Sequence, residues 1–178
     1  MKIIDFEHNG TTYHLCMNAA ALFDIYAKFG SENPVLSHIQ DMGKKGFEAV
    51  CWMLWKLAEQ GELVRRWQGH RPEPIPREGQ FRALLAPDQA SEARLAIAEA
   101  VKQGFAREIS TERPDCVDLG LQQLKAAQGG GDKTLSEYLD MATQVLGLNV
   151  GDAMRMTPGQ VHDLVALELR RGRLRKAE

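Results

Sequence analysis

The spacing of hydrophobic residues changes early in the chain from that of strands to that of helices. Two short apolar runs, residues 3–6 and 13–16, flank the turn sequence His8-Asn9-Gly10. Asn-Gly between two apolar runs predicts a β-hairpin, because both residues tolerate the positive φ angles of a type I′ turn. A two-stranded hairpin is only marginally stable alone, so we expect it to pack on another part of the fold.

After the hairpin the spacing is helical. Asn18 is the expected N-cap of a helix over residues 19–29, and Gly30 is the expected end of that helix. Asn33-Pro34 predicts the start of a short second helix, since proline is favoured at the first helical position. One apolar stripe along the first helix consists of Leu22, Ile25, Tyr26 and Phe29.

The helix predicted over residues 46–60 is apolar on nearly every side. One of its faces carries Phe47, Val50, Cys51, Leu54, Trp55 and Ala58. Four further apolar residues fall outside that face: Ala49, Trp52, Met53 and Leu57. Such a helix either lies at the centre of the core or offers one side to a partner.

The rest of the chain divides at a run of glycines. Three prolines within residues 71–76 predict an extended segment, which helices over about 87–105 and 113–128 follow. The glycines at 129–131 predict a linker, because each glycine loses much backbone freedom in a helix or strand. We therefore predict an N-terminal domain over residues 1–128, a linker over 129–133 and a C-terminal module over 134–178.

The C-terminal module is predicted to be helical. Thr134 is the expected N-cap of its first helix, which Gly147 ends, and Thr157-Pro158-Gly159-Gln160 has the pattern of a capping box. The module is short for a stable domain, so we expect it to dock on the first part or on another molecule. The predicted fold class is mainly α with a small N-terminal β-hairpin (α+β): a helical domain plus a small C-terminal helical module.

Composition and charge narrow the function classes. The chain has 178 residues, 44% of them hydrophobic and 26% charged, with a formal net charge of -2. That balance of hydrophobic and charged residues is typical of globular proteins. The slightly negative net charge disfavours a protein that binds duplex nucleic acid through its whole surface. The longest clean apolar run, residues 49–55, is too short to cross a bilayer. Three widely spaced cysteines and an acidic N-terminus favour a cytoplasmic protein with no export signal.

The sequence offers little chemistry. His14 and Cys16 would point to the same side of a strand, but no further metal ligand lies at a suitable spacing. The run Gly129-Gly130-Gly131 does not follow a strand and lacks the pattern of a phosphate loop. Pairs of nearby acidic residues fall on polar segments of the sequence, where we expect solvent-exposed faces and no catalytic cleft. We therefore predict no enzyme activity, no metal and no cofactor.

Two features favour binding. The basic C-terminal tail is expected to complement the helix dipole in solvent, and its alternative is an electrostatic patch for an acidic partner. The first interpretation is favoured, because the rest of the chain is slightly acidic and no aromatic residues alternate with the bases. The tail consists of Arg170, Arg171, Arg173, Arg175 and Lys176.

Tryptophan is the second feature, because exposed tryptophan commonly anchors an interface. Trp55 lies on the main apolar stripe and is expected in the core. For Trp52, and for Trp67 beside Arg65-Arg66, a core role and a partner contact both stay open. We name a candidate contact surface made of Trp52, Met53, Trp67, Arg65 and Arg66.

The order of these parts resembles the tail assembly chaperones of long-tailed bacteriophages and prophages. The resemblance rests on the strand Gly10-Thr11-Thr12-Tyr13-His14-Leu15, the step Asn18-Ala19 into a helix, and the tryptophan-rich helix at 47–57. The segments 146–148 and 156–164 resemble the second module of such chaperones. The resemblance covers roughly residues 1–65 and 134–175, and the region between them matches nothing comparable.

The resemblance implies a non-enzymatic role. Members of that family coat the long helical tape-measure protein, keep it soluble and bring tail-tube subunits to it. They act in the host cytoplasm and are not expected in the mature virion. The implied partners are the tape-measure and tail-tube proteins, with self-association left open. This chain resembles an extended or fused two-module form.

A second hypothesis belongs to another class. A small nucleic-acid-associated regulator would use the tail from Arg170 to Lys176. Its binding would weaken steeply with added salt and would be lost when the chain ends after Leu169.

Overall fold

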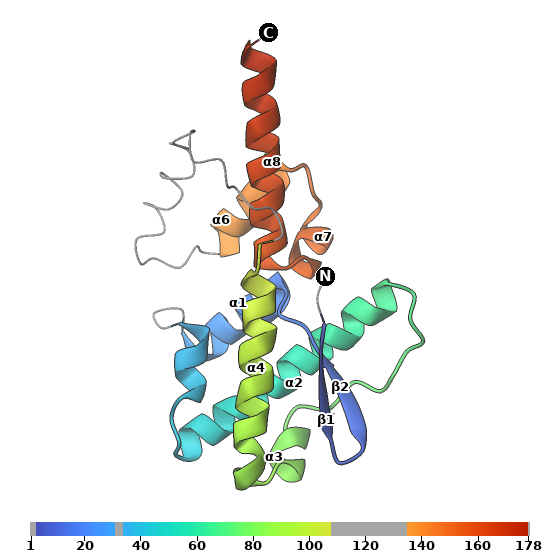
Figure 1. Ribbon diagram of the computed structural model, residues 1–178, viewed down its shortest axis with the longest axis vertical. Helices are drawn as coiled ribbons and strands as arrows, with labels where there is room; N and C mark the ends of the chain where they lie inside the picture. The colour runs from blue at the N-terminus through green and yellow to red at the C-terminus, as the bar shows by residue number, and fades with distance from the viewer. Residues whose placement is uncertain (1–2, 31–33, 108–134, 178) are drawn as a thin grey trace. The chain divides into compact units, whose positions relative to one another are not determined.

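The computed structural model describes residues 3–30, 34–107 and 135–177, with side chains described up to residue 171. These residues fall into two compact units, Met1–Phe105 and Ala106–Glu178, and each unit is described separately. Helices dominate both units, and the one sheet in the described part of the chain is an N-terminal two-stranded hairpin (Figure 1). The predicted fold class, mainly α with a small hairpin, is confirmed.

The hairpin forms where the sequence predicts it. Strand β1 (Ile4–His8) pairs antiparallel with β2 (Thr11–Leu15), and Ile4 lies opposite Leu15. The two turn residues have positive φ angles, 50° at Asn9 and 74° at Gly10. Both residues therefore adopt the left-handed conformation that a type I′ turn requires.

Helix α1 (Ala19–Phe29) begins at a buried polar cap. The Asn18 side-chain oxygen accepts a hydrogen bond from the Ala21 amide at 2.9 Å, and the Asn18 side-chain amide donates to Gln60 at 3.0 Å. The predicted N-cap is thus confirmed, and it also ties α1 to the next long helix. Gly30 ends α1 with a φ of 87°.

The short second helix is a 3-10 turn. It spans Val35–Ile39 (η1), and Pro34 occupies its N-cap position rather than its first helical position. Asn33, the expected cap, lies outside the described residues.

Helix α2 (Lys44–Trp67) is the central element of the first unit. It continues well beyond the predicted end at residue 60. A methyl group on Gly61 would lie 1.7 Å from the His14 carbonyl oxygen, so the backbone of β2 passes directly over this glycine. Next to it, the Cys16 amide donates to the Leu57 carbonyl at 3.0 Å. Gly61 therefore serves close packing inside the helix and does not end it.

The core of the first unit lies between the hairpin, α1, α2 and α4 (Ala90–Phe105), and α4 crosses α2 in Figure 1. Helix α4 follows η2 (Pro87–Gln89), a further 3-10 turn. The predicted helix over 87–105 is therefore confirmed, with its first three residues in 3-10 rather than α conformation. Residues 70–77 form neither helix nor strand, as the three prolines suggest. A short helix, α3 (Gln80–Leu84), was not predicted; it buries Phe81 in the core.

The second unit consists of short helices and one long one. Helix α6 (Leu135–Asp140) runs into a π-helical turn, η3 (Met141–Val145), and α7 (Val150–Arg155) precedes α8 (Pro158–Ala177). The predicted capping box at α8 is confirmed. The Gln160 amide donates to the Thr157 hydroxyl at 3.3 Å, and the Thr157 amide donates to the Gln160 side chain at 3.1 Å.

Some predictions fall outside the described residues or were incomplete. The predicted helix over 113–128 and the glycine linker over 129–133 lie outside the described residues. Helix α7 was not predicted, although Asn149 caps it by accepting from the Asp152 amide at 2.9 Å.

The contact at Gly61 generates a stability prediction. Gly61→Ala should lower the free energy of unfolding by about 1–3 kcal/mol, because the new methyl group overlaps the backbone of β2. Helix propensity alone predicts the opposite, a gain of about 1 kcal/mol. Urea unfolding followed by circular dichroism decides between them. A variant as stable as the parent chain would contradict the close approach.

Candidate functional site

Four aromatic rings meet where α1, η1 and α2 come together. The rings of Phe29 and Trp52 pack edge to face with centroids 5.3 Å apart, and His38 stacks on Phe29 at 5.3 Å. Trp55 also packs edge to face against Trp52, with centroids 5.7 Å apart. Such aromatic pairs contribute about 0.5–1.5 kcal/mol beyond their buried area. Trp52 is thus held in one orientation although its side chain is only partly buried.

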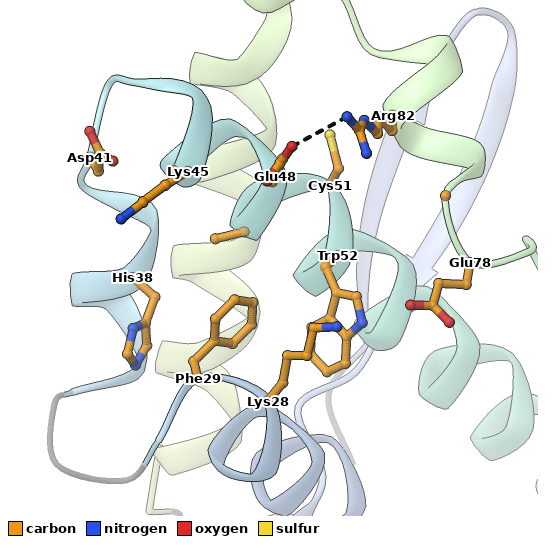
Figure 2. Close-up of a pocket in the computed structure, with 13 residues that line it drawn as sticks. Lys28, Phe29, His38, Asp41, Lys45, Glu48, Cys51, Trp52, Glu78 and Arg82 are labelled. Carbon is orange, nitrogen blue, oxygen red and sulfur yellow. Dashed lines mark ion pairs between the residues drawn. The ribbon is translucent and has the colours of Figure 1, made fainter.

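A pocket of about 510 Å³ opens beside this aromatic cluster (Figure 2). Its volume lies in the range of pockets that hold small molecules, about 300–1,000 Å³. Phe29, Ala49 and Trp52 supply apolar lining, and charged side chains surround them. The charged lining residues are Lys28, Asp41, Lys45, Glu48, Glu78 and Arg82.

Only some of these charges are compensated. Arg82 lies 3.3 Å from a Glu48 carboxylate oxygen, and Asp41 accepts a hydrogen bond from the Gly43 amide at 2.8 Å. The Lys28 ammonium lies 5.7 Å from the Trp52 ring centroid, a cation–π contact. Figure 2 shows no ion pair between the drawn residues other than that of Glu48 with Arg82.

His38 adds an unsatisfied polar atom. Its Nε2 atom is buried and has no hydrogen-bond partner within the described part of the chain. A buried polar atom without a partner costs about 1–3 kcal/mol relative to a bonded one. Protein atoms cover this ring nitrogen, so an incoming group would reach it only after a side-chain movement.

Cys51 lines the pocket but is not an activated nucleophile. Its side chain is buried, and burial raises the pKa of the Cys51 thiol even though Arg82 opposes this shift. The reactive form of cysteine is the thiolate, which a raised pKa disfavours. The Cys51 thiol is therefore protonated at neutral pH and is a poor nucleophile.

The predicted contact residues do not form one continuous patch. Trp67 is 59% exposed at the end of α2, fifteen residues after Trp52 and so about 22 Å away along the helix axis. Met53 has no exposed surface and belongs to the core, which corrects its assignment to a contact surface. Successive residues of a helix point in directions about 100° apart, so Met53 faces the core cluster while Trp52 stays partly exposed.

Arg65 and Arg66 are engaged within the chain. Both hold the carboxylate of Glu62, at 2.8 Å from Arg65 and 2.9 Å from Arg66, and the Glu73 amide donates to Glu62 at 2.7 Å. Glu62 is only 3% exposed. Burial alone would raise the pKa of Glu62, but the hydrogen bonds from Arg66, the Glu73 amide and Arg65 outweigh it and lower that pKa. These arginines fasten residues 70–77 to α2.

Trp55 lies against the core, as expected. It is partly buried, its indole N–H donates to the Pro76 carbonyl at 3.0 Å, and the Lys56 ammonium lies 4.4 Å from its ring centroid. Both the indole N–H and the ring face of Trp55 therefore have partners inside the molecule.

The basic tail is described only at its start. Arg170 and Arg171 are exposed on α8, and Arg171 lies 3.6 Å from Glu168. The side chains of Arg173, Arg175 and Lys176 lie outside the described residues. A cation near the C-terminal end of a helix is favourable in itself.

Among the residues that the structure describes, no three histidine, cysteine or acidic side chains gather in a way that would hold a metal ion. The described helices also include none with the length and apolar character that spanning a membrane requires. Comparisons with protein-family models, curated proteins and solved structures find no match to this chain.

Sequence reasoning placed Trp52 in the candidate site but missed most of its surroundings. His38, Lys45 and Arg82 come from η1, the start of α2 and α3, and no motif links them. Only the packing of α1, η1 and α3 around α2 brings the three side chains around one pocket.

The buried carboxylate of Glu62 generates a prediction about acid stability. Because its pKa in the folded chain is lowered, its stabilising effect is complete above the ordinary glutamate pKa of about 4.3 and is lost as the pH falls through the lowered value. Glu62→Gln should cost about 1.5–3 kcal/mol at pH 7 and much less at pH 2–3. Urea unfolding at both pH values tests this, and an equal loss at both would contradict it.

Proposed function

We propose that this chain is a non-enzymatic tail assembly chaperone that binds a tape-measure protein and brings tail-tube subunits to it. The support begins with the sequence resemblance. Its first motif corresponds to one structural unit, in which β2 leads through the Asn18 cap into α1. In this proposal the protein acts in the host cytoplasm and leaves before the virion is complete.

The observation that carries the proposal is the partly buried Trp52 at the wall of an open pocket. Its inner side is held by Phe29 and Trp55, so the indole needs no ordering when a partner arrives. Interfaces typically combine an apolar centre with a polar rim, and rigid aromatic side chains are their usual anchors. The charged side chains around Trp52 supply such a rim.

A chaperone of a long helical rod has to bind reversibly at many places. A small apolar centre gives modest affinity per copy, and its charged rim limits aggregation of the free protein. Trp67, far along the same helix, provides a second exposed aromatic contact for an extended partner. Contacts spread along α2 suit a partner that is itself a long helix.

The second unit is proposed to contact the tube protein. It has several exposed large apolar side chains of its own: Leu135, Val145, Val150, Leu164 and Leu169. Two linked binding units raise the effective concentration of each for its partner, which is what bringing two proteins together requires.

Co-expression with a tape-measure protein tests this function. Trp52→Ala should raise the Kd for the tape-measure protein roughly thirtyfold and so lower the amount that co-purifies, because truncating a central anchor costs about 2 kcal/mol. The far-UV circular dichroism spectrum should not change. Failure of the parent chain to retain any tape-measure protein would overturn the proposal.

Leu95→Ala is the matched control. Leu95 is a large apolar residue of the same unit, is 72% exposed on α4 and does not line the pocket. We expect this variant to retain the tape-measure protein as the parent chain does. If Trp52→Ala loses helicity and binding together, Trp52 is a core residue only, and the assignment of the binding surface to it is wrong.

A further inference from the structure

We propose that the pocket beside Trp52 receives one large apolar side chain of a partner helix, and that an acidic residue one turn away on that helix pairs with Lys45. This inference rests on the proposed function and adds the chemistry of recognition. The occupant is a helical segment of the tape-measure protein with an aromatic or long aliphatic residue followed or preceded by Asp or Glu at a spacing of three or four.

The pocket lining determines the first half of this description. The exposed sides of Phe29 and Trp52 form an apolar floor with Ala49 beside it, and both rings are held in place by further aromatic contacts. A flat ring or a long aliphatic chain matches such a floor and gains by leaving water. Preformed anchoring pockets of this kind receive single side chains from amphipathic helices.

The uncompensated charges determine the second half. Arg82 and Glu48 satisfy each other, and Lys28 already lies over the Trp52 ring. Lys45 is exposed and has no ion pair in the described part of the chain. Its ammonium is therefore available to a carboxylate from outside.

His38 lies on the same side of the floor as Lys45. In Figure 2 both side chains lie to the left of Phe29, whereas Glu78 lies to the right of Trp52. The Nε2 atom of His38 is buried, so the imidazole serves as a wall of the pocket and Lys45 is the group that meets the carboxylate. Acidic side chains lie on both sides of the floor, Asp41 near Lys45 and Glu78 beyond Trp52, so the partner's carboxylate has to reach the Lys45 ammonium itself.

Helix geometry links the two contacts. Side chains three or four residues apart project from one face of a helix and lie about 5–6 Å apart at their Cβ atoms. An apolar residue over Phe29 can then place a carboxylate of the next turn toward Lys45. A partner helix with lysine or arginine at that position would face Lys45 with a like charge and should be rejected.

Two adjacent lysines make a matched test. Lys44 and Lys45 are both exposed in the first turn of α2, but only Lys45 lines the pocket. Fluorescence anisotropy with overlapping 25-residue tape-measure peptides would identify binding segments of the full-length chain. We expect Lys45→Gln to weaken the best peptide about five- to tenfold, and Lys44→Gln to change it by less than twofold.

A charge reversal makes the test specific. Lys45→Glu should weaken the peptide further, and replacing the peptide's acidic residue by lysine should restore binding to Lys45→Glu but not to the parent chain. If the parent chain binds tape-measure peptides and the two lysine variants behave alike, the pocket inference is overturned while the proposed function stands. If no peptide binds the parent chain, the proposed function fails instead.

A small probe tests the pocket without any tape-measure protein. N-acetyl-phenylalanine has a ring and a carboxylate, and N-acetyl-phenylalaninamide has the ring alone. In NMR titrations we expect both to shift resonances of Trp52 and Phe29, and the acid to bind several-fold more tightly in the parent chain but not in Lys45→Gln. Equal affinities for the acid and the amide in the parent chain would overturn the role of Lys45.

Discussion

The first unit depends on one close contact between backbones. Strand β2 lies so near α2 that a methyl group on Gly61 would overlap the His14 carbonyl, and the Cys16 amide bonds to a carbonyl of the same helix. The hairpin thereby gains the support that two isolated strands lack. The chain then leaves β2 at a fixed place on α2, so α1 begins beside the helix on which it packs.

Polar ties then hold α1 and the proline-rich segment against α2. Asn18 bonds both to the start of α1 and to Gln60, and Lys56 lies 3.1 Å from Asp24 of α1. On the last turns of α2, Glu62 holds the segment that contains Glu73. Each tie satisfies a buried polar group, which would be costly if left alone. Together they hold the start of α1 and the segment around Glu73 against the second half of α2.

The candidate site is a consequence of this arrangement. With α1 fixed on α2, Phe29 meets Trp52, and the 3-10 turn η1 stacks His38 on Phe29. Only one side of Trp52 is then used by the core. The remaining side is rigid and apolar, and charged side chains surround it. The same arrangement buries Met53 in the core, although Trp52, the residue before it, is only partly buried.

Local signals in the sequence were sufficient for the hairpin, the Asn18 cap, the helix that Gly30 ends and the capping box at Thr157, because each depends on residues a few positions apart. These local signals did not predict features that depend on residues distant in the sequence. Gly61 continues a helix because β2 passes over it, and the buried Glu62 is stabilised by arginines and by a later backbone amide. Likewise, apolar periodicity indicated that α2 either lies at the centre of the core or offers one side to a partner, but it could not decide between the two. Only the packing of α1, η1 and α3 around α2 decided that Trp52 faces a pocket and Met53 the interior, since burial is a property of the neighbours and not of the residue itself.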